Sequence, residues 1–452
     1  MGPGEHSEAR ETQRKPRSRA RFELKREAIL DAAADLINLH GARGATLQEV
    51  ANAVGLNTTS VTYYFRRKEL LAAAVFERSI DRLKAMVGEA AAEADARARV
   101  ARFIRLHIEL RAKVIRGAEK PLVVLSDIRT LDEDLRLALL ARYRKAFNAV
   151  RAFWAPFYSD DHRDLCTARA HMLLEVVFWL PVWLARYAIN DFGRVSRRIG
   201  AVLEEGLAAP GAKWAPVFYG EDQIRAAMPP QDAAAENFLR VATRLINESG
   251  YRGASVLRIV EELNVTKGSF YHHLDAKDDL VLECFRQSYK RVAVAQWLAH
   301  RDGSNEWERL TWAIASLLDI QFRAQWPLTR TTALQALPAQ LRAEVVRRSD
   351  RIALRFMGTL VDGAREGSIN PVDPMIASQL ILSTLNSAFD LKGWAARLPR
   401  EKAIALYAST LAGGLFDDSV LGESAEAGGQ KSQRIRTAAD GEVERVRGIE
   451  PL

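Results

Sequence analysis

Apolar side chains recur at intervals of three and four residues along most of this chain, which is the spacing of one face of an α-helix. Between Leu24 and His40 the pattern predicts a helix, and Gly41 is placed to end it. The long stretches after residues 71 and 281 lack the two-residue alternation of a strand. We therefore expect an all-α protein. The apolar stripe of the first helix consists of Ala28, Ile29, Ala32, Ala33, Leu36 and Ile37.

Two short helices are predicted directly after the first. Thr46 and Glu49 have the spacing of a capping box, which opens the second helix. Gly55 supplies a left-handed turn residue, and Asn57 or Thr58 can cap the third helix. A helix, a short helix, a glycine-containing turn and another short helix are typical of a helix-turn-helix unit.

The same unit occurs twice. A shift of 209 residues aligns residues 30–71 with 239–280 without a gap, and we interpret the chain as two copies of one unit. Thr46 and Ser255 are both helix caps, and Gly55 and Asn264 both tolerate a left-handed turn. The identical pairs are Leu30/Leu239, Ala33/Ala242, Leu36/Leu245, Ile37/Ile246, Asn38/Asn247, Gly41/Gly250, Arg43/Arg252, Gly44/Gly253, Ala45/Ala254, Ser60/Ser269, Lys68/Lys277 and Leu71/Leu280.

The third helix of the second copy lies within V-T-K-G-S-F-Y-H-H-L-D-A-K-D-D-L, residues 265–280. Thr266 is its predicted N-cap. Phe270 and Leu274, four residues apart, form its only apolar face, so its hydroxyl, imidazole and ammonium groups mostly point elsewhere. Such a helix is suited to contact a polyanion.

Changes in composition along the chain predict seven segments. Each helix-turn-helix head is followed by a helical bundle, with a Pro- and Gly-rich linker between the two halves. We expect a disordered basic arm at 1–22, the first head at 23–70, the first regulatory bundle at 71–207, the linker at 208–232, the second head at 233–280, the second regulatory bundle at 281–416 and a disordered tail at 417–452.

Charge and cysteine content narrow the class of protein. Lys and Arg number 65 against 57 for Asp and Glu, a net charge of +8, which permits nucleic acid as a partner without establishing it. Cys166 and Cys284 are far apart and suggest neither a disulfide nor a zinc site. The N-terminus has no apolar signal core, and the apolar window at 172–185 is shorter than a membrane span. We expect a cytoplasmic protein that does not enter a membrane.

No constellation of residues predicts an enzyme, a cofactor or a metal. Residues 160–164, D-D-H-R-D, point in different directions and are interpreted as a solvated loop. His171 and Glu175 are four apart on a helix, but no second histidine completes an H-E-x-x-H motif. Phosphate-binding loops, dinucleotide fingerprints and G-x-S-x-G are absent from the sequence.

Aromatic clusters occur in both bundles and are interpreted mainly as core. A minority is expected to line an apolar ligand pocket. Trp179, Trp183 and Tyr187 share one helix face beside Pro181, which should kink that helix. The weaker candidates in the second bundle are Trp326 and Trp394.

These residues resemble the TetR family of transcriptional regulators. The resemblance is carried by G-Y-R-G-A-S and I-V-E-E-L-N-V-T-K-G-S-F-Y-H-H-L-D-A-K-D-D-L in the second copy. The first copy, G-A-R-G-A-T-L-Q-E-V-A-N-A-V-G-L-N-T-T-S-V-T-Y-Y-F-R-R-K-E-L-L, is similar but departs from the family pattern at Thr59 and Thr62. The motifs cover about 100 of the 452 residues.

The resemblance implies that the third helix of each head enters the major groove of double-stranded DNA. Tyr64 and His273 are expected to pack against the first helix of their heads, and Val61, Phe65, Phe270 and Leu274 belong to the core. The implied DNA contacts are Asn57, Thr58, Ser60, Thr62, Tyr63 and Lys68 in the first head, and Thr266, Lys267, Ser269, Tyr271, His272 and Lys277 in the second.

The resemblance also implies that each bundle binds a small molecule or a partner subunit. Because the two third helices differ in sequence, we expect one chain to act as a pseudo-dimer on an asymmetric operator, with a homodimer of chains as an alternative. The expected activity is repression relieved by a small apolar or aromatic effector. The alternative is a helical ligand-sensing or protein-interaction module in which one or both heads no longer bind DNA.

Overall fold

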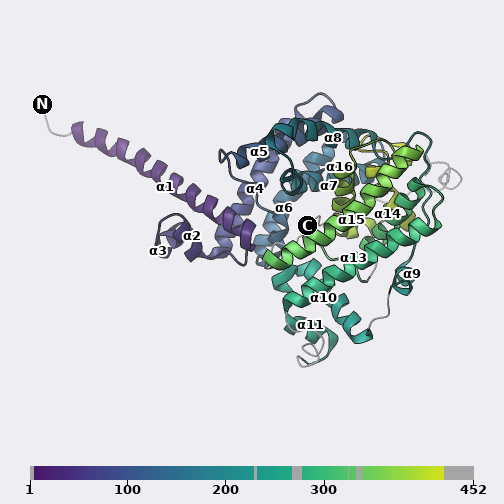
Figure 1. Cartoon of the computed structure of the whole chain (residues 1–452). Helices are drawn as coiled ribbons and strands as arrows, with labels where there is room; N and C mark the ends of the chain where they lie inside the picture. The colour runs from purple at the N-terminus through teal and green to yellow at the C-terminus, as the bar shows by residue number, and fades with distance from the viewer. Residues whose placement is uncertain are drawn as a thin grey trace, which may run out of the picture. The chain divides into compact units, whose positions relative to one another are not determined.

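The computed structural model describes residues 5–228, 232–266, 277–323, 325–331, 337 and 339–421. These residues form helices joined by loops and turns, with one isolated bridge between Ala208 and Ile369 and no strand among them (Figure 1). Two compact units are present: Met1–Leu83 with Lys113–Tyr143, and Lys84–Ala112 with Arg144–Leu452. Their boundaries fall inside three helices, α4 (Lys68–Ala91), α5 (Ala96–Ile115) and α6 (Glu133–Arg151). The all-α prediction is confirmed for the described residues.

The first head consists of α1 (Glu5–His40), α2 (Leu47–Ala53), α3 (Thr58–Tyr64) and the start of α4. Thr46 and Glu49 form the predicted capping box, because the Thr46 hydroxyl accepts from the Glu49 N–H and the Glu49 carboxylate accepts from the Thr46 N–H. Asn57 caps α3 by accepting from the Ser60 N–H at 2.7 Å. Val61 and Phe65 are buried, as expected.

Helix α1 begins well before the predicted start near Leu24. Residues 5–22, expected as a disordered arm, are helical in the structure. The composition explains the difference, because Glu, Arg, Gln and Ala are strong helix formers even where no apolar stripe exists. A disordered arm was expected because the segment lacks apolar periodicity. Such periodicity indicates whether a helix packs against a core, not whether a helix forms.

The second head repeats the local features of the first. It contains α10 (Ala233–Gly253), α11 (Val256–Leu263) and the start of α13 (Lys277–Asp302). Ser255 caps α11, and Asn264 adopts the left-handed conformation expected of it, with φ 53°. Gly41 and Gly250, an identical pair in the repeat, have φ values of 73° and 72°. Both positions need a glycine because an L side chain is strained there.

The remaining described helices, apart from η1, belong to the larger unit. Helices α13, α14 and α15 pack on one another, and α7 packs on α16 and α18 (Figure 1). The bounds are η1 (Leu125–Thr130) in the smaller unit, and η2 (Ala152–Trp154), α7 (Asp160–Leu184), η3 (Ile189–Asp191), α8 (Phe192–Glu205), α9 (Glu221–Ala226), α14 (Glu306–Arg323), α15 (Ala339–Glu366), α16 (Pro374–Ser387), η5 (Ala388–Leu391), α17 (Lys392–Ala395) and α18 (Arg400–Ala412) in the larger one.

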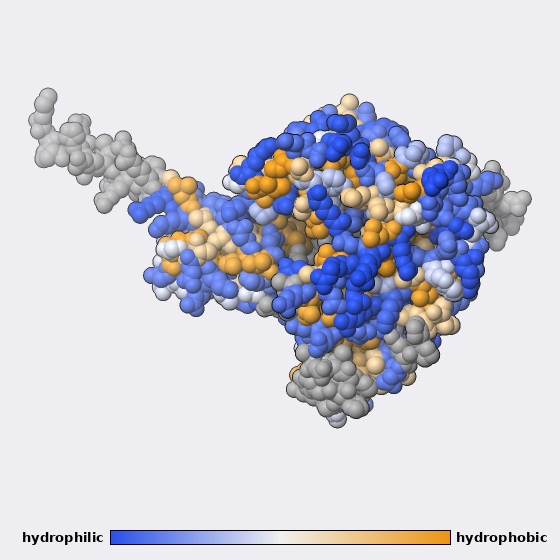
Figure 2. All heavy atoms as spheres, in the orientation of Figure 1, coloured by the Kyte–Doolittle hydropathy of each residue, from blue (hydrophilic) through white to orange (hydrophobic). Residues whose placement is uncertain are grey.

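Helix α7 is the one described helix that is long and apolar enough to cross a membrane, and 72% of that window is buried inside the structure. Pro181 lies within it, three residues before the helix ends at Leu184. Figure 2 shows hydrophilic residues over much of the visible surface, with hydrophobic residues scattered between them. Helix α7 therefore occupies the place of a core helix.

The expected linker, 208–232, is partly ordered against the second bundle. It contains α9, and the buried Tyr219 donates its hydroxyl to the carbonyl of Leu298 at 3.1 Å. Its Pro and Gly content predicted a loop, but a buried tyrosine and a short helix anchor it. The segment after α18 is likewise engaged, since Arg169 donates to the carbonyl of Asp417 and to the carboxylate of Asp418. The residues of the expected tail beyond 421 lie outside the described part.

The ends of α8 and α18 contact each other reciprocally. The N–H of Leu207 donates to the carbonyls of Leu411 and Ala412, and the N–H of Leu415 donates to the carbonyl of Leu203. Leu203 and Leu207 precede Leu411 and Leu415 by the same 208 residues (411 − 203 and 415 − 207). Leu207 of the first half thus contacts Leu411 of the second, and the corresponding Leu415 of the second half contacts Leu203 of the first. Such reciprocal contacts are typical of a two-fold arrangement.

An extended segment between helices is held in the same way in both halves of the chain. We name residues 120–124 and 326–330 the clamped segments; each contains a Pro-Leu pair. In the first, Asn38 of α1 donates to the carbonyl of Leu122 and accepts from the N–H of Val124, both at 3.2 Å. Ser79 accepts from the Val123 N–H, and Arg82 donates to the Lys120 carbonyl at 2.7 Å.

In the second half every one of these bonds recurs. Asn247 donates to the carbonyl of Leu328 at 2.8 Å and accepts from the N–H of Arg330 at 2.9 Å. Ser288 accepts from the Thr329 N–H, and Arg291 donates to the Trp326 carbonyl. The side chains that clamp lie 209 residues apart, so the repeat extends beyond the heads into α4 and α13. Each head is thereby bonded to a segment of its own bundle.

Replacing Asn247 with Ala should lower the free energy of unfolding by on the order of 2–4 kcal/mol, because two buried backbone groups then lose their partner. Urea unfolding followed by circular dichroism measures the change. Asn237→Ala is the control, since Asn237 is exposed on the same helix. Equal stabilities for the two variants would contradict a structural role for the clamp.

Candidate nucleic-acid interface and buried polar sites

The first head presents α3 with its first turn exposed. Asn57 is fixed by its cap, and Thr58 and Thr59 are exposed beside it. Ser60 is half-buried, and the hydroxyl of Thr62 donates to the carbonyl of Thr59 at 2.9 Å. The Thr62 hydroxyl is thus already bonded within its own helix.

The two tyrosines of α3 differ in environment. Tyr63 is 76% exposed, whereas Tyr64 is half-buried and its ring lies 4.7 Å from that of Phe22 in α1. Tyr64 therefore packs against the first helix, as expected for it. Tyr63 touches Tyr64 and Phe22 only through edge contacts, with ring centroids 5.4 and 6.2 Å away. Its ring and hydroxyl face outward.

A hollow of about 350 Å³ lies where α1 and α3 meet. Exposed cations of the head include Lys25 in its lining, Arg43, and Arg66 and Arg67 after α3. Hydroxyls, an amide and a cation around one hollow match the groups that bind phosphate and sugar. The lining residues are Lys25, Leu56, Asn57, Thr59, Ser60, Tyr63 and Tyr64.

Lys68 and Lys277, expected among the contacts of the third helices, are the first residues of α4 and α13. The ammonium of Lys68 donates to the carbonyl of Arg43 at 3.2 Å. The helix dipole does not stabilise a cation at the helix N-terminus. An anion bound there would interact favourably with both the lysine ammonium group and the helix dipole.

The second head is described in part. Thr266 is exposed after α11, and Lys277 is half-buried. The other expected contacts, Lys267, Ser269, Tyr271 and His272, lie outside the described residues, as do Phe270, His273 and Leu274.

An apolar pocket lies between α7, α8 and α16 in the larger unit. Trp183 and Tyr187 line it, but Trp179 does not and instead donates its indole N–H to Glu175 at 3.3 Å. The pocket holds about 10 Å³, the space of a single water molecule. Burial raises the pKa of the Tyr187 hydroxyl. The lining residues are Leu180, Trp183, Leu184, Arg186, Tyr187, Val195, Ile199, Met375, Ile376 and Gln379.

The two aromatic candidates of the second bundle are packed in the core. Trp326 is 6% exposed and donates to the hydroxyl of Thr243, while Arg291 lies over its ring. Trp394 is 1% exposed and donates to the carboxylate of Asp164 at 3.0 Å. Neither lines the apolar pocket.

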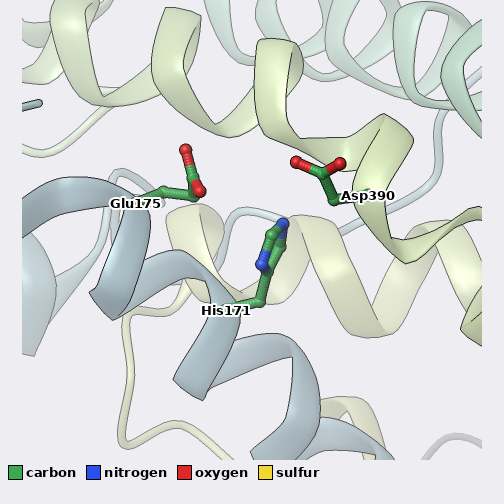
Figure 3. A group of neighbouring side chains, drawn as sticks. All are labelled: His171, Glu175 and Asp390. Atoms are coloured by element: carbon green, nitrogen blue, oxygen red, sulfur yellow. The ribbon is translucent and has the colours of Figure 1, made fainter. Parts of the chain in front are cut away.

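A cluster of ionisable groups lies inside the larger unit, where α7 meets η5. Figure 3 shows His171 and Glu175 of α7 turned toward Asp390 of η5. Asp390 forms a buried ion pair with Arg330, whose side chain is 5% exposed. Burial, and then the Asp390 carboxylate, raises the pKa of Glu175 to about 8, and burial lowers the pKa of His171. Glu175 keeps some accessible surface although its carboxyl group is enclosed by protein.

One signal for this cluster is visible in the sequence, the i, i+4 spacing of His171 and Glu175. It could not reveal Asp390 or Arg330, which belong to the second half of the chain. Asp390 lies in a stretch that reads as core because its neighbours are apolar.

Comparison with known proteins agrees with the repeat. The family described as "Bacterial regulatory proteins, tetR family" matches residues 29–75 and 238–284, which are again 209 residues apart (238 − 29). The family described as "Tetracyclin repressor-like, C-terminal domain" matches residues 303–390.

Named relatives are regulators of transcription. The chain is 25% identical over 150 residues to the HTH-type transcriptional repressor AcnR of Corynebacterium efficiens, covering 28% of this chain and 78% of AcnR. It is 34% identical over 94 residues to the HTH-type transcriptional regulator RutR of Escherichia coli (strain K12), covering 21% and 44%. A crystal structure of AibR in complex with isovaleryl coenzyme A and operator DNA is 22% identical, with TM-score 0.36, over 40% of this chain and 99% of that one.

Replacing Asp390 with Ala should lower the free energy of unfolding by about 3–5 kcal/mol, because the Arg330 charge is then buried without its partner. Asp350→Ala is the matched control, since Asp350 pairs with Arg186 at a surface where both are about 40% exposed. That loss should stay below about 1 kcal/mol. Similar losses of unfolding free energy for the two variants in urea would show that the buried ion pair contributes no more to stability than the exposed one.

Proposed function

We propose that this chain, which is a tandem TetR-like protein, is a cytoplasmic, sequence-specific DNA-binding regulator that represses transcription until a small apolar or aromatic effector binds. The observation that carries the proposal is the duplicated head: both copies match the family of tetR bacterial regulatory proteins, and the two matches are 209 residues apart. In the described head, α3 presents an exposed tyrosine beside a hollow lined by polar and cationic groups.

The two heads supply different contacts to DNA. In the first, Tyr63 and the hydroxyls of Thr58 and Ser60 contact bases or phosphates, with Asn57 and Thr62 holding the helix. Lys68 and Lys277 neutralise phosphates at the starts of α4 and α13. Thr266, Lys267, Ser269, Tyr271 and His272 are the proposed contacts of the second head.

One chain acts as a pseudo-dimer in this proposal. It is supported by the reciprocal bonds of Leu207 and Leu415 and by the packing of α7 and α8 on α16 and α18. In a symmetric dimer such contacts would join two chains. Here they join two halves with different third helices, which favours an asymmetric operator.

The effector acts on the bundles, and we propose the pocket of Trp183 and Tyr187 as its site. At about 10 Å³ this pocket is closed, and a ligand of aromatic size would have to part α7 from α16. Binding that favours the parted arrangement shifts the heads through the clamped segments; such coupling is typically about 1–3 kcal/mol. The name of AcnR, a repressor, supports the sign of regulation.

The second candidate is a ligand-sensing or protein-interaction module in which the first head no longer binds DNA. It is favoured by the departures at Thr59 and Thr62, and by the bond between them that occupies the Thr62 hydroxyl. Binding measurements on head-specific variants separate the two candidates.

Binding to DNA from upstream of the protein's own gene should weaken steeply with salt, because bound phosphates release counterions. Lys68→Ala and Lys277→Ala should each reduce the slope of log affinity against log salt by about one. Lys84→Ala, an exposed lysine farther along α4, is the control and should leave the slope unchanged. Absence of any complex at low salt would remove the DNA-binding proposal.

A single chain should occupy one operator, and the operator should lack two-fold symmetry. Mass measurement of the free chain and of its complex tests this, and footprints of Ser60→Ala and Ser269→Ala should lose protection over different half-sites. A stable dimer of chains on a perfect palindrome would contradict the pseudo-dimer. Loss of protection in the Ser269 variant alone would favour the second candidate.

A further inference from the structure

The cluster of His171, Glu175 and Asp390 brings three metal-ligating groups together. One ligand atom from each residue lies within 4.8 Å of the others. An i, i+4 pair on α7 places the imidazole and one carboxyl group on the same helix face, and η5 brings the second carboxyl group opposite them (Figure 3). One imidazole and two carboxylates form a donor set for a divalent first-row transition ion.

Each of the three side chains also has a hydrogen-bond partner outside the cluster. The Nε2 of His171 lies 3.0 Å from the carbonyl of Ser387. A carbonyl can only accept, so Nε2 carries the proton and Nδ1 bears the lone pair. The carboxylate of Glu175 accepts from Trp179 through Oε2, which leaves Oε1 as the ligand atom.

Asp390 completes this pattern. Its Oδ2 accepts from Arg330, whereas its Oδ1 has no hydrogen-bond partner among the described residues, although the side chain is only 4% exposed. A buried carboxylate oxygen without a partner calls for an explanation, because such groups are nearly always satisfied. Ligands that are each oriented by an outer hydrogen bond are characteristic of metal sites.

We propose that the imidazole of His171, the carboxyl group of Glu175 and Asp390 Oδ1 bind a divalent transition ion of the Zn²⁺ class. Tetrahedral ligands around Zn²⁺ are about 3.3 Å apart, so the three groups approach by on the order of 1 Å when the ion binds. Glu175 retains some accessible surface, so its side chain has room to adjust. Arg330 stays on the outer oxygen of Asp390 and orients it.

The site joins the two halves of the chain, because α7 precedes the linker and η5 follows the second head. The ion-pair partner Arg330 is the same residue whose N–H bonds to Asn247 of α10. The proposed metal site is separate from the apolar pocket, because none of its three ligands lines that pocket.

Isothermal titration of the full chain with Zn²⁺, after removal of metals with EDTA, tests the site. We expect one Zn²⁺ per chain, with at least a tenfold loss of affinity in Glu175→Gln and in Asp390→Asn. Trp179→Phe, which removes only the outer bond to Glu175, should weaken binding about tenfold. With Co²⁺ as the probe, its visible absorption should change in the same variants.

Cys166→Ser is the matched control, because the Cys166 thiol lies 3.5 Å from Nε2 of His162 and a thiol beside an imidazole could also attract Zn²⁺. Its affinity for Zn²⁺ should equal that of the unaltered chain. Two results overturn the proposal: no Zn²⁺ or Co²⁺ bound by the full chain, or binding that Glu175→Gln and Trp179→Phe leave unchanged. Circular dichroism establishes whether each variant is folded. If Glu175→Gln does not fold, the affinity of Trp179→Phe for Zn²⁺ still tests the site.

Discussion

Buried backbone groups must find hydrogen-bond partners, and this requirement shapes both halves of the chain. The clamped segments leave helical structure, so their N–H and C=O groups cannot bond within a helix. In each half an asparagine, a serine and an arginine supply the missing partners from two helices. The asparagine belongs to the first helix of the head, so the bond that satisfies the segment also attaches the head to its bundle. Any movement of the clamped segment must therefore be followed by that helix or must break the bonds.

Features that depend on neighbouring residues could be predicted from the sequence. The capping box of Thr46 and Glu49, the caps at Asn57 and Ser255 and the left-handed Asn264 follow from side chains that reach backbone groups within three or four residues. The repeat was visible because these local requirements preserve residue types at fixed spacing. Asn38 and Asn247 were recognised as an identical pair, but their role was not, since their bonding partners lie more than 80 residues away.

Features that depend on tertiary contacts could not be predicted. Asp390 lies near His171 only because α16, which η5 follows, packs on α7, and no local pattern links positions so far apart in the chain. The aromatic candidates show the same limit: on one helix face, Trp183 lines a pocket and Trp179 bonds to a carboxylate. Trp326 and Trp394 are of a residue type that often contacts ligands. Their indole N–H groups instead donate to other side chains of the protein. Spacing identifies the face of a helix but not what that face meets.

Val124 and Arg330 show how the two halves came to differ while their scaffold stayed the same. Each donates its N–H to the clamping asparagine, so the backbone performs one task at both positions. At position 124 the side chain is apolar and half-buried, which needs no further partner. At position 330 it is a buried arginine, whose charge requires the carboxylate of Asp390 close by. Together with burial, which has the larger effect, that carboxylate raises the pKa of Glu175, and its Oδ1 has no hydrogen-bond partner among the described residues. A change of side chain at one clamped position is thus sufficient to make the second half chemically distinct, with no change in the bonds that attach its head.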